Sequence, residues 1–171
     1  MTEATSHLVV VWIARLAGGV YLLAVWQWLA TRDGRQMSSP AFRWYWGLAW
    51  VLLMLHVAAA FHWVHGWEHA AAAEHTAAMT GRVTGWYWSG GLYINYLFLV
   101  IWGVDVGRVS LNRKHTSGLL MQVISAFMWF NATVVFGTLW WLVPVAVWVF
   151  ACRKQLRPFV FTARGVDQVD K

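Results

Sequence analysis

The chain has 171 residues, of which 60% are hydrophobic and only 12% are charged. Soluble domains contain roughly 45–50% apolar and about 25% charged residues, so this composition excludes a water-soluble globular domain. The 15 tryptophans likewise exclude a disordered chain. Lysine and arginine outnumber aspartate and glutamate by 13 to 7, and in so apolar a chain we interpret this excess as a sign of membrane orientation rather than nucleic-acid binding.

Three long apolar stretches follow one another along the first two thirds of the chain. We predict membrane spans at about residues 8–30, 44–67 and 86–106. Each stretch is long enough to cross a hydrocarbon core of about 30 Å at a rise of about 1.5 Å per residue. No other secondary structure satisfies its own backbone hydrogen bonds within a single span, so we expect these stretches to be helices.

The last apolar stretch, residues 118–152, is too long for one helix unless that helix is steeply tilted. We divide it into spans at about 119–135 and 138–152, with a turn near Gly137 because glycine tolerates positive φ. The fold class that we predict is therefore an all-α integral membrane protein with about five transmembrane helices over residues 1–152. The number falls to four if the last stretch forms one helix.

Basic residues mark the segments that we place in the cytoplasm. The loops at 31–43 and 107–116 carry three Lys or Arg residues each, and the tail at 153–171 carries five, whereas the segment 68–85 carries Arg82 alone. Cytoplasmic loops are enriched in Lys and Arg. We therefore predict that the N-terminus lies outside, that the basic tail is cytoplasmic, and that the number of crossings is odd.

Many tryptophans fall near the ends of the predicted spans, where an indole can keep its ring in an apolar layer and its N–H near water. We interpret them as aromatic belts at the two membrane surfaces, and a cage for a pigment or ligand is the alternative. These residues are Trp12, Trp26, Trp28, Trp44, Trp46, Trp63, Trp67, Trp86, Trp88, Trp102, Trp140 and Trp141.

Five of the seven histidines lie within residues 56–75, at the outer end of the second predicted span. Because alanine is the best helix former, residues 70–73 favour a helix that continues past the membrane surface toward Ala78. One face of such a helix carries the candidate metal ligands His62, His65, Glu68, His69 and His75. Imidazole is the commonest metal ligand near neutral pH, so we predict a site for Zn or Cu there, with His7 as a further candidate.

Two other interpretations of this segment remain open. The histidines could serve as belt residues that bond lipid headgroups and backbone, or as a proton sensor that titrates near pH 6.5. The string from His65 to His69 also matches the H-x-x-E-H zinc signature of inverted zincin peptidases. Those enzymes need a distant acidic ligand. The only Glu that follows the string is Glu74, five residues on, and Asp105, Asp167 and Asp170 are predicted to be cytoplasmic, so we do not predict a peptidase.

His56 lies near the middle of the second predicted span and is a candidate ligand for haem iron. A second axial ligand would have to come from a methionine such as Met121 or Met128, or from His56 of a second copy. A lone histidine within an apolar span can equally be a neutral, packed residue bonded to the backbone of a neighbouring helix.

Two functions are consistent with these features. In the first, the protein binds a transition metal (Zn or Cu) or haem iron at its outer face, within a redox or metal-handling complex. In the second, it is a structural accessory subunit with no cofactor of its own. We lean against an enzyme because the sequence contains no catalytic pair at a recognisable spacing. The expected partners are the lipid bilayer and other membrane subunits or a second copy, with no nucleic acid.

Overall fold

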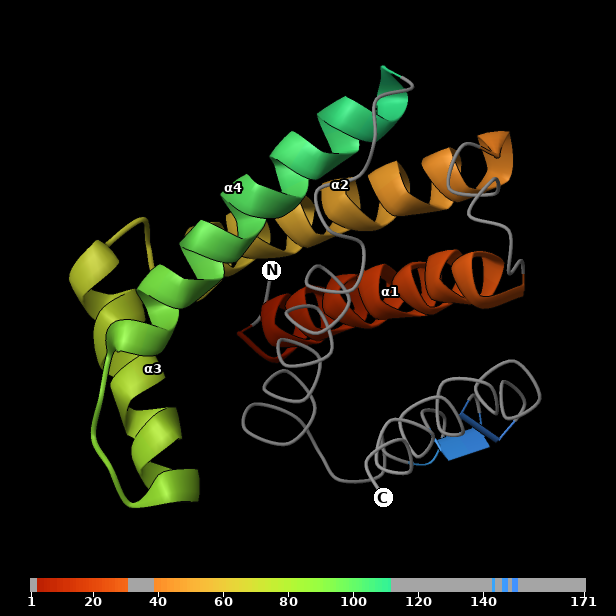
Figure 1. Ribbon diagram of the computed structural model, residues 1–171. Coiled ribbons are helices and arrows are strands. Elements are labelled where there is room, and N and C mark those ends of the chain that lie inside the picture. The colour runs from red at the N-terminus through yellow and green to blue at the C-terminus, as the bar shows by residue number, and fades with distance from the viewer. Residues whose placement is uncertain (1–2, 31–38, 112–142, 144–145, 148, 151–171) are drawn as a thin grey trace, which may run out of the picture.

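The computed structural model describes residues 3–30, 39–111, 143, 146–147 and 149–150 (Figure 1). Over the two long ranges helices are the only regular secondary structure, and the prediction of an all-α fold is confirmed. The four helices are α1 (Glu3–Ala30), α2 (Pro40–Trp63), α3 (His69–Thr84) and α4 (Gly90–Ser110).

Three of these helices are long and apolar enough to cross a membrane. They correspond to the first three predicted spans, with shifted ends: residues 4–28 of α1, all of α2 and all of α4. The second helix begins four residues before the predicted span because the Ser39 hydroxyl accepts the Phe42 N–H at 3.1 Å and Pro40 occupies the first turn. The predicted spans at 119–135 and 138–152 and the tail at 153–171 lie outside the described residues, apart from five positions between 143 and 150. A count of five spans is thus not confirmed.

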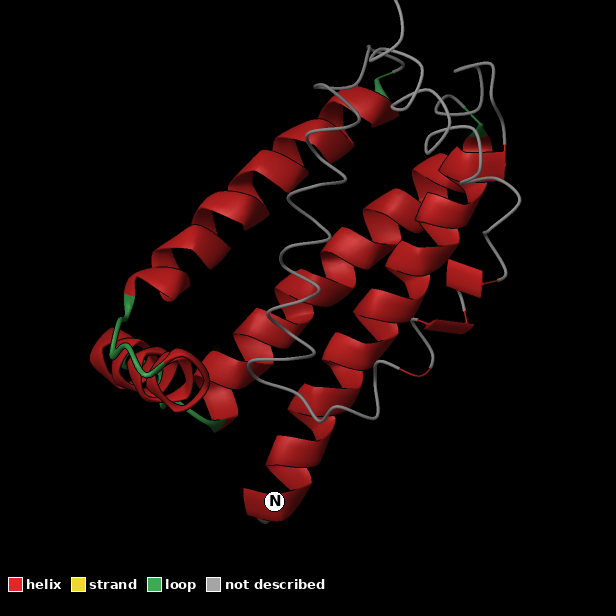
Figure 2. Ribbon diagram, turned by 60° about the horizontal axis from the view of Figure 1, so that its bottom comes forward, coloured by secondary structure: helices red, strands yellow, loops and turns green. Residues whose placement is uncertain are grey.

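The helices are arranged as three roughly lengthwise rods and one transverse helix. α1 and α2 run side by side in opposite directions, and α4 crosses over α2 (Figures 1 and 2). α3 lies across one end of these rods and packs against α4. We call this end the histidine end; it comprises the start of α1, the end of α2, all of α3 and the start of α4.

The core lies toward the opposite end, where the three spanning helices meet around aromatic side chains. Trp46 of α2 is fully buried, and its ring centroid lies 5.0 Å from that of Trp102 on α4 and 6.0 Å from that of Tyr21 on α1. The Trp46 indole N–H donates to the carboxylate of the fully buried Asp105 at 3.0 Å. Trp46 and Trp102 therefore belong to the core, and assigning these two residues to a membrane-surface belt was wrong.

Candidate metal centre

A sharp turn interrupts the histidine-rich segment. α2 ends at Trp63, and the backbone N–H groups of Val64 and His65 both bond to the Ala60 carbonyl, at 2.9 and 3.1 Å. The helix resumes only at His69. The prediction of a helix that continues unbroken to Ala78 was wrong, so the shared helical face inferred from it does not exist.

The turn is formed by residues with left-handed backbone conformations. Gly66 has φ 57° and Trp67 has φ 63°, and the Glu68 N–H closes the turn on the His65 carbonyl at 2.9 Å. Glycine adopts this conformation without steric cost, whereas it is uncommon for a bulky residue such as tryptophan. The preference of Gly66 for this conformation outweighs the helix propensity of the alanines that follow. The chain therefore changes direction sharply between His65 and α3.

The turn at Gly66 and Trp67 brings His65 and His75 together. His65 lies in the turn and is partly buried, while His75 lies on the exposed side of α3. Their imidazole centroids are 5.5 Å apart, with the rings inclined at 59°. The Phe61 ring of α2 also lies against His65, with the two ring centroids 5.8 Å apart. These two candidate ligands, one from each side of the turn, are neighbours.

The environment of His65 favours its uncharged form. Burial lowers the pKa of its imidazole, and the neighbouring His75 lowers that pKa further because two positive rings repel each other. A neutral imidazole is the form that binds metal ions. His65 thus has a free nitrogen lone pair at a pH where an ordinary histidine is still partly protonated.

His62 has a different neighbour. Its Nδ1 accepts the indole N–H of Trp67 at 3.3 Å, and its ring lies against that of Trp63 with centroids 5.5 Å apart. Accepting a hydrogen bond at Nδ1 places the proton of a neutral imidazole on Nε2. In this arrangement His62 stabilises the turn through Trp67 and has no free lone pair.

His69 begins α3 and lies between two tyrosines of α4. Its ring centroid is 5.6 Å from that of Tyr93 and 5.8 Å from that of Tyr96. Tyr96 also lies 6.4 Å from Phe61, so aromatic contacts run from His69 through Tyr96 to the residue that packs on His65. His69 therefore joins the aromatic surroundings of the His65–His75 pair, and no ring contact between His69 and either of these histidines occurs in the described structure.

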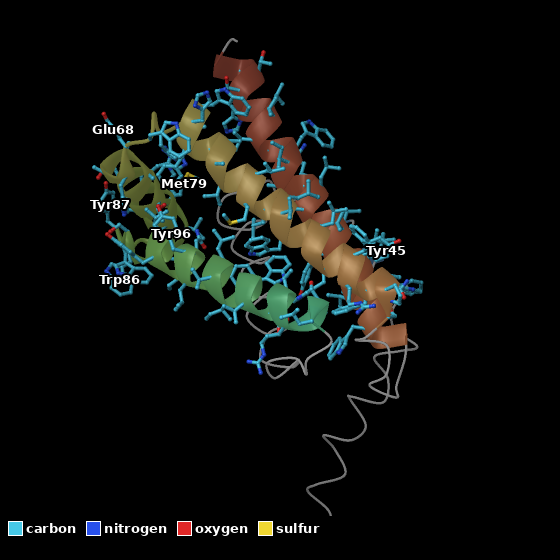
Figure 3. The ribbon with its side chains drawn as sticks, turned by 90° about the horizontal axis from the view of Figure 1, so that it is seen from above. Tyr45, Glu68, Met79, Trp86, Tyr87 and Tyr96 are labelled. Carbon is cyan, nitrogen blue, oxygen red and sulfur yellow. The ribbon has the colours of Figure 1, made fainter. Side chains whose placement is uncertain are left out.

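The two acidic residues of the segment are exposed, Glu68 just before α3 and Glu74 on it. Glu68 is the residue before the helix, and its carbonyl accepts the Ala72 N–H at 3.2 Å. The Glu74 carboxylate accepts a short hydrogen bond from the Tyr87 hydroxyl, and this bond raises the pKa of Tyr87. Figure 3 shows Glu68, Tyr87 and Trp86 together at the histidine end.

His56 lies in the interface between α1 and α2. Its Nδ1 is 2.9 Å from the Val10 carbonyl oxygen, so Nδ1–H donates to that oxygen and Nε2 carries the lone pair. The contact ties the two helices together, which is the packing alternative that the sequence left open. Met121 and Met128, the candidate second ligands of a haem, lie outside the described residues.

In the part of the chain that the structure describes, no group of three or more His, Cys, Asp or Glu side chains is arranged to hold a metal ion. The H-x-x-E-H string is divided as well, because His65 lies in the turn and His69 on α3. Zincin ligands need one continuous helix to present both histidines, so the string has a different local structure here.

Sequence reasoning missed the two tyrosines that contact His69, one of which, Tyr96, also contacts Phe61. Tyr93 and Tyr96 stand three residues apart at the start of α4, and this spacing places both on one side of a helix. The spacing of the two tyrosines is visible in the sequence. Their contact with His69 could not be predicted from it, because that contact depends on the change of chain direction at Gly66.

No family model, curated protein or solved structure matches this chain. Its function is therefore inferred from its own residues.

Proposed function

We propose that this protein binds a transition-metal ion, Zn²⁺ or Cu²⁺, at the histidine end, as a small membrane subunit of a redox or metal-handling complex. The observation that carries the proposal is the 5.5 Å separation of the His65 and His75 ring centroids. Zn–N bonds of about 2.0–2.1 Å place each ring centre ~3.2 Å from the ion, so two imidazoles on a tetrahedral ion have centres about 5 Å apart. The observed separation fits two imidazoles that share one ion.

The surroundings of the pair support exchange of the ion rather than permanent enclosure. His75 is exposed, and His65 is only partly buried. An ion held by two imidazoles keeps two further positions for water, for a substrate or for donors from another chain. A site of this kind is suited to passing a metal to a partner or to presenting it for redox chemistry.

We place the histidine end on the outer side of the membrane. Arg43, near the start of α2, and Arg108, near the end of α4, both lie toward the other end of the rods. With the basic loops inside, the positive-inside rule directs the histidine end outward.

The test is metal content after equilibrium dialysis of the purified, membrane-embedded protein against Zn²⁺ or Cu²⁺. We expect about one ion per chain, lost in both His65→Ala and His75→Ala, and retained in the control His7→Ala, which removes an exposed imidazole from α1. Loss in His69→Ala with retention in His75→Ala would instead support the ligand set inferred from helical spacing. Absence of binding, or full binding in the His65→Ala/His75→Ala double variant, would overturn the proposal.

The alternative function, a structural accessory subunit, is favoured by the surface of α4. Tyr93, Leu97, Val100 and Val104 form an apolar stripe on this helix, each at least 56% exposed. Their 4-3-4 spacing matches one face of a helix and suits either lipid or the packing of another helix. The test is cross-linking from Val100→Cys in native membranes, in a Cys152→Ser background. A cross-linked partner helix would support this function, and the absence of any cross-linked product would indicate that lipid covers the stripe.

A further inference from the structure

The two connections that flank α3 carry exposed tryptophans. Trp67, just before α3, is 64% exposed, and Trp86, just after it, is 68% exposed. Trp88 is exposed as well and stacks on Trp86 with centroids 5.7 Å apart and rings inclined at 13°. Apolar rings of this size gain free energy by leaving water, so a purely aqueous location of both connections is unfavourable.

α3 itself has a different surface. The side chains buried against α4 are Ala72, Thr76 and Ala77, and Gly91 at the start of α4 lets Thr76 approach closely. Most exposed positions carry small, polar or charged side chains, such as Ala70, Glu74, His75 and Arg82, and the one exposed large apolar side chain of α3 is Val83, next to its last residue. α3 therefore has no continuous exposed apolar face along its length that could enter hydrocarbon, and its exposed large apolar side chains lie at its two ends.

The position of α3 matches the membrane surface. It is seen nearly end-on in Figure 2, transverse to the spanning helices and beside the end of α2 and the start of α4, and α4 starts at Gly90, two residues after Trp88. Between Arg82 and Asp105 the chain has no Asp, Glu, Lys or Arg. The exposed aromatic segment before α4 is thus continuous with a helix that is apolar enough to span the bilayer.

Two contacts hold the Trp86–Trp88 segment in place. The Tyr87 hydroxyl bonds to Glu74 on α3, which joins the segment to the helix. A side chain at Gly90 would overlap the Trp88 ring, so the absence of one lets that ring lie directly against the start of α4. Trp86 and Trp88 therefore lie on a loop that is held in place by contacts with α3 and with the start of α4.

From these observations we propose that α3 lies along the headgroup layer of the outer leaflet, anchored in the bilayer interface by Trp67 at one end and by Trp86 and Trp88 at the other. Indole rings favour this layer because the ring leaves water while the N–H keeps a polar partner. The exposed tryptophans therefore contact the interfacial layer of the same membrane that the helices span. The proposal stands whether or not a metal binds, and it places His65 and His75 at the membrane surface.

The test measures membrane depth at single positions of the full chain in liposomes. A Cys152→Ser background removes the sole cysteine, and nitroxide labels are attached at Trp86→Cys, Trp88→Cys and the matched control Ala70→Cys. Collisions with oxygen report access from lipid, and collisions with a water-soluble nickel chelate report access from water. Thermal unfolding of each labelled protein checks that it is folded.

We expect labels at 86 and 88 to collide several-fold more often with oxygen, relative to the nickel chelate, than the label at 70. Equal nickel access at 70, 86 and 88 would overturn the proposal by placing the loop in water. Immobilised labels at 86 and 88 that neither reagent reaches would also overturn it, because they would show that another protein surface covers the tryptophans.

Discussion

The chemistry of the histidine end depends on which ring each imidazole touches. His65 faces His75, while His62 accepts a hydrogen bond from Trp67 and His69 lies against Tyr93. These four histidines, which look alike in the sequence, therefore have different neighbours in the structure. The His65–His75 pair is the one arrangement among them that suits metal binding.

Protonation of His65 links this arrangement to pH. Its pKa is lowered in the folded protein, so between the lowered and the ordinary pKa of about 6.5 the unfolded chain binds more protons. The stabilising effect of neutral His65 is present above pH 6.5 and is lost as pH falls toward the lowered value. We expect His65→Gln to weaken the loss of thermal stability between pH 7 and pH 5. An identical pH profile for His65→Gln and the parent would contradict this assignment.

At the scale of elements, the turn between α2 and α3 decides which residues meet. Gly66 has φ 57°, and an added Cβ would meet no atom within 4 Å, so a substitution there tests backbone conformation alone. We expect Gly66→Ala to lower the free energy of unfolding by about 1–2 kcal/mol, the cost of a left-handed non-glycine residue. Denaturant titration of helicity measures this, with Gly19→Ala, a helical position that is equally open, as the control. Equal stabilities of the two variants would contradict the left-handed turn.

The packing of α4 on α2 makes a second prediction. An alanine Cβ at Gly103 would lie 2.9 Å from the Trp50 ring, whose N–H donates to the Leu99 carbonyl at 3.0 Å. Because the ring must move, we expect Gly103→Ala to destabilise the protein by about 1–3 kcal/mol. Gly107 on the same helix has no atom within 4 Å of its added Cβ, and alanine there should be neutral or stabilising by up to about 1 kcal/mol. The contrast is read from thermal unfolding of both variants, and a stable Gly103→Ala would mean that the helices are farther apart.

The existence of the helices was predictable from sequence, but the contacts between them were not. Hydropathy located three spans because any apolar stretch of that length is helical in a bilayer. The break after Trp63 was missed because the helix propensity of the alanines was weighted above the conformational preference of Gly66. Trp46 was misassigned because an indole near a span end has the same sequence pattern whether it faces lipid or the core.

For the molecule as a whole, orientation follows from the placement of the basic loops. A short loop with several Lys or Arg residues is retained in the cytoplasm, so we expect a reporter fused after Lys171 to be active only on the cytoplasmic side. Labelling of a cysteine at Ala70 from outside intact cells is the companion measurement. A reporter active outside would contradict the cytoplasmic tail and, with the N-terminus outside, an odd number of crossings.

The histidine end combines three features that no single element provides. The turn supplies His65, α3 supplies His75, and α4 supplies the tyrosines that pack on His69 and, through Phe61, on this pair. α3 is held against α4 by small residues, and its two ends carry tryptophans. A metal held by the pair would therefore lie beside the membrane surface, where a soluble or membrane-bound partner can reach it.

The most direct test of the metal centre is pulsed electron paramagnetic resonance of Cu²⁺ added at less than one equivalent to the protein in lipid nanodiscs. The remote nitrogens of bound imidazoles modulate the Cu²⁺ signal, and combination lines appear only when two imidazoles bind the same ion. We expect two imidazoles in the parent protein and in His7→Ala, and one or none in His65→Ala and in His75→Ala. A Cu²⁺ signal with no imidazole modulation, or one unchanged when both histidines are replaced, would contradict a metal centre at this pair.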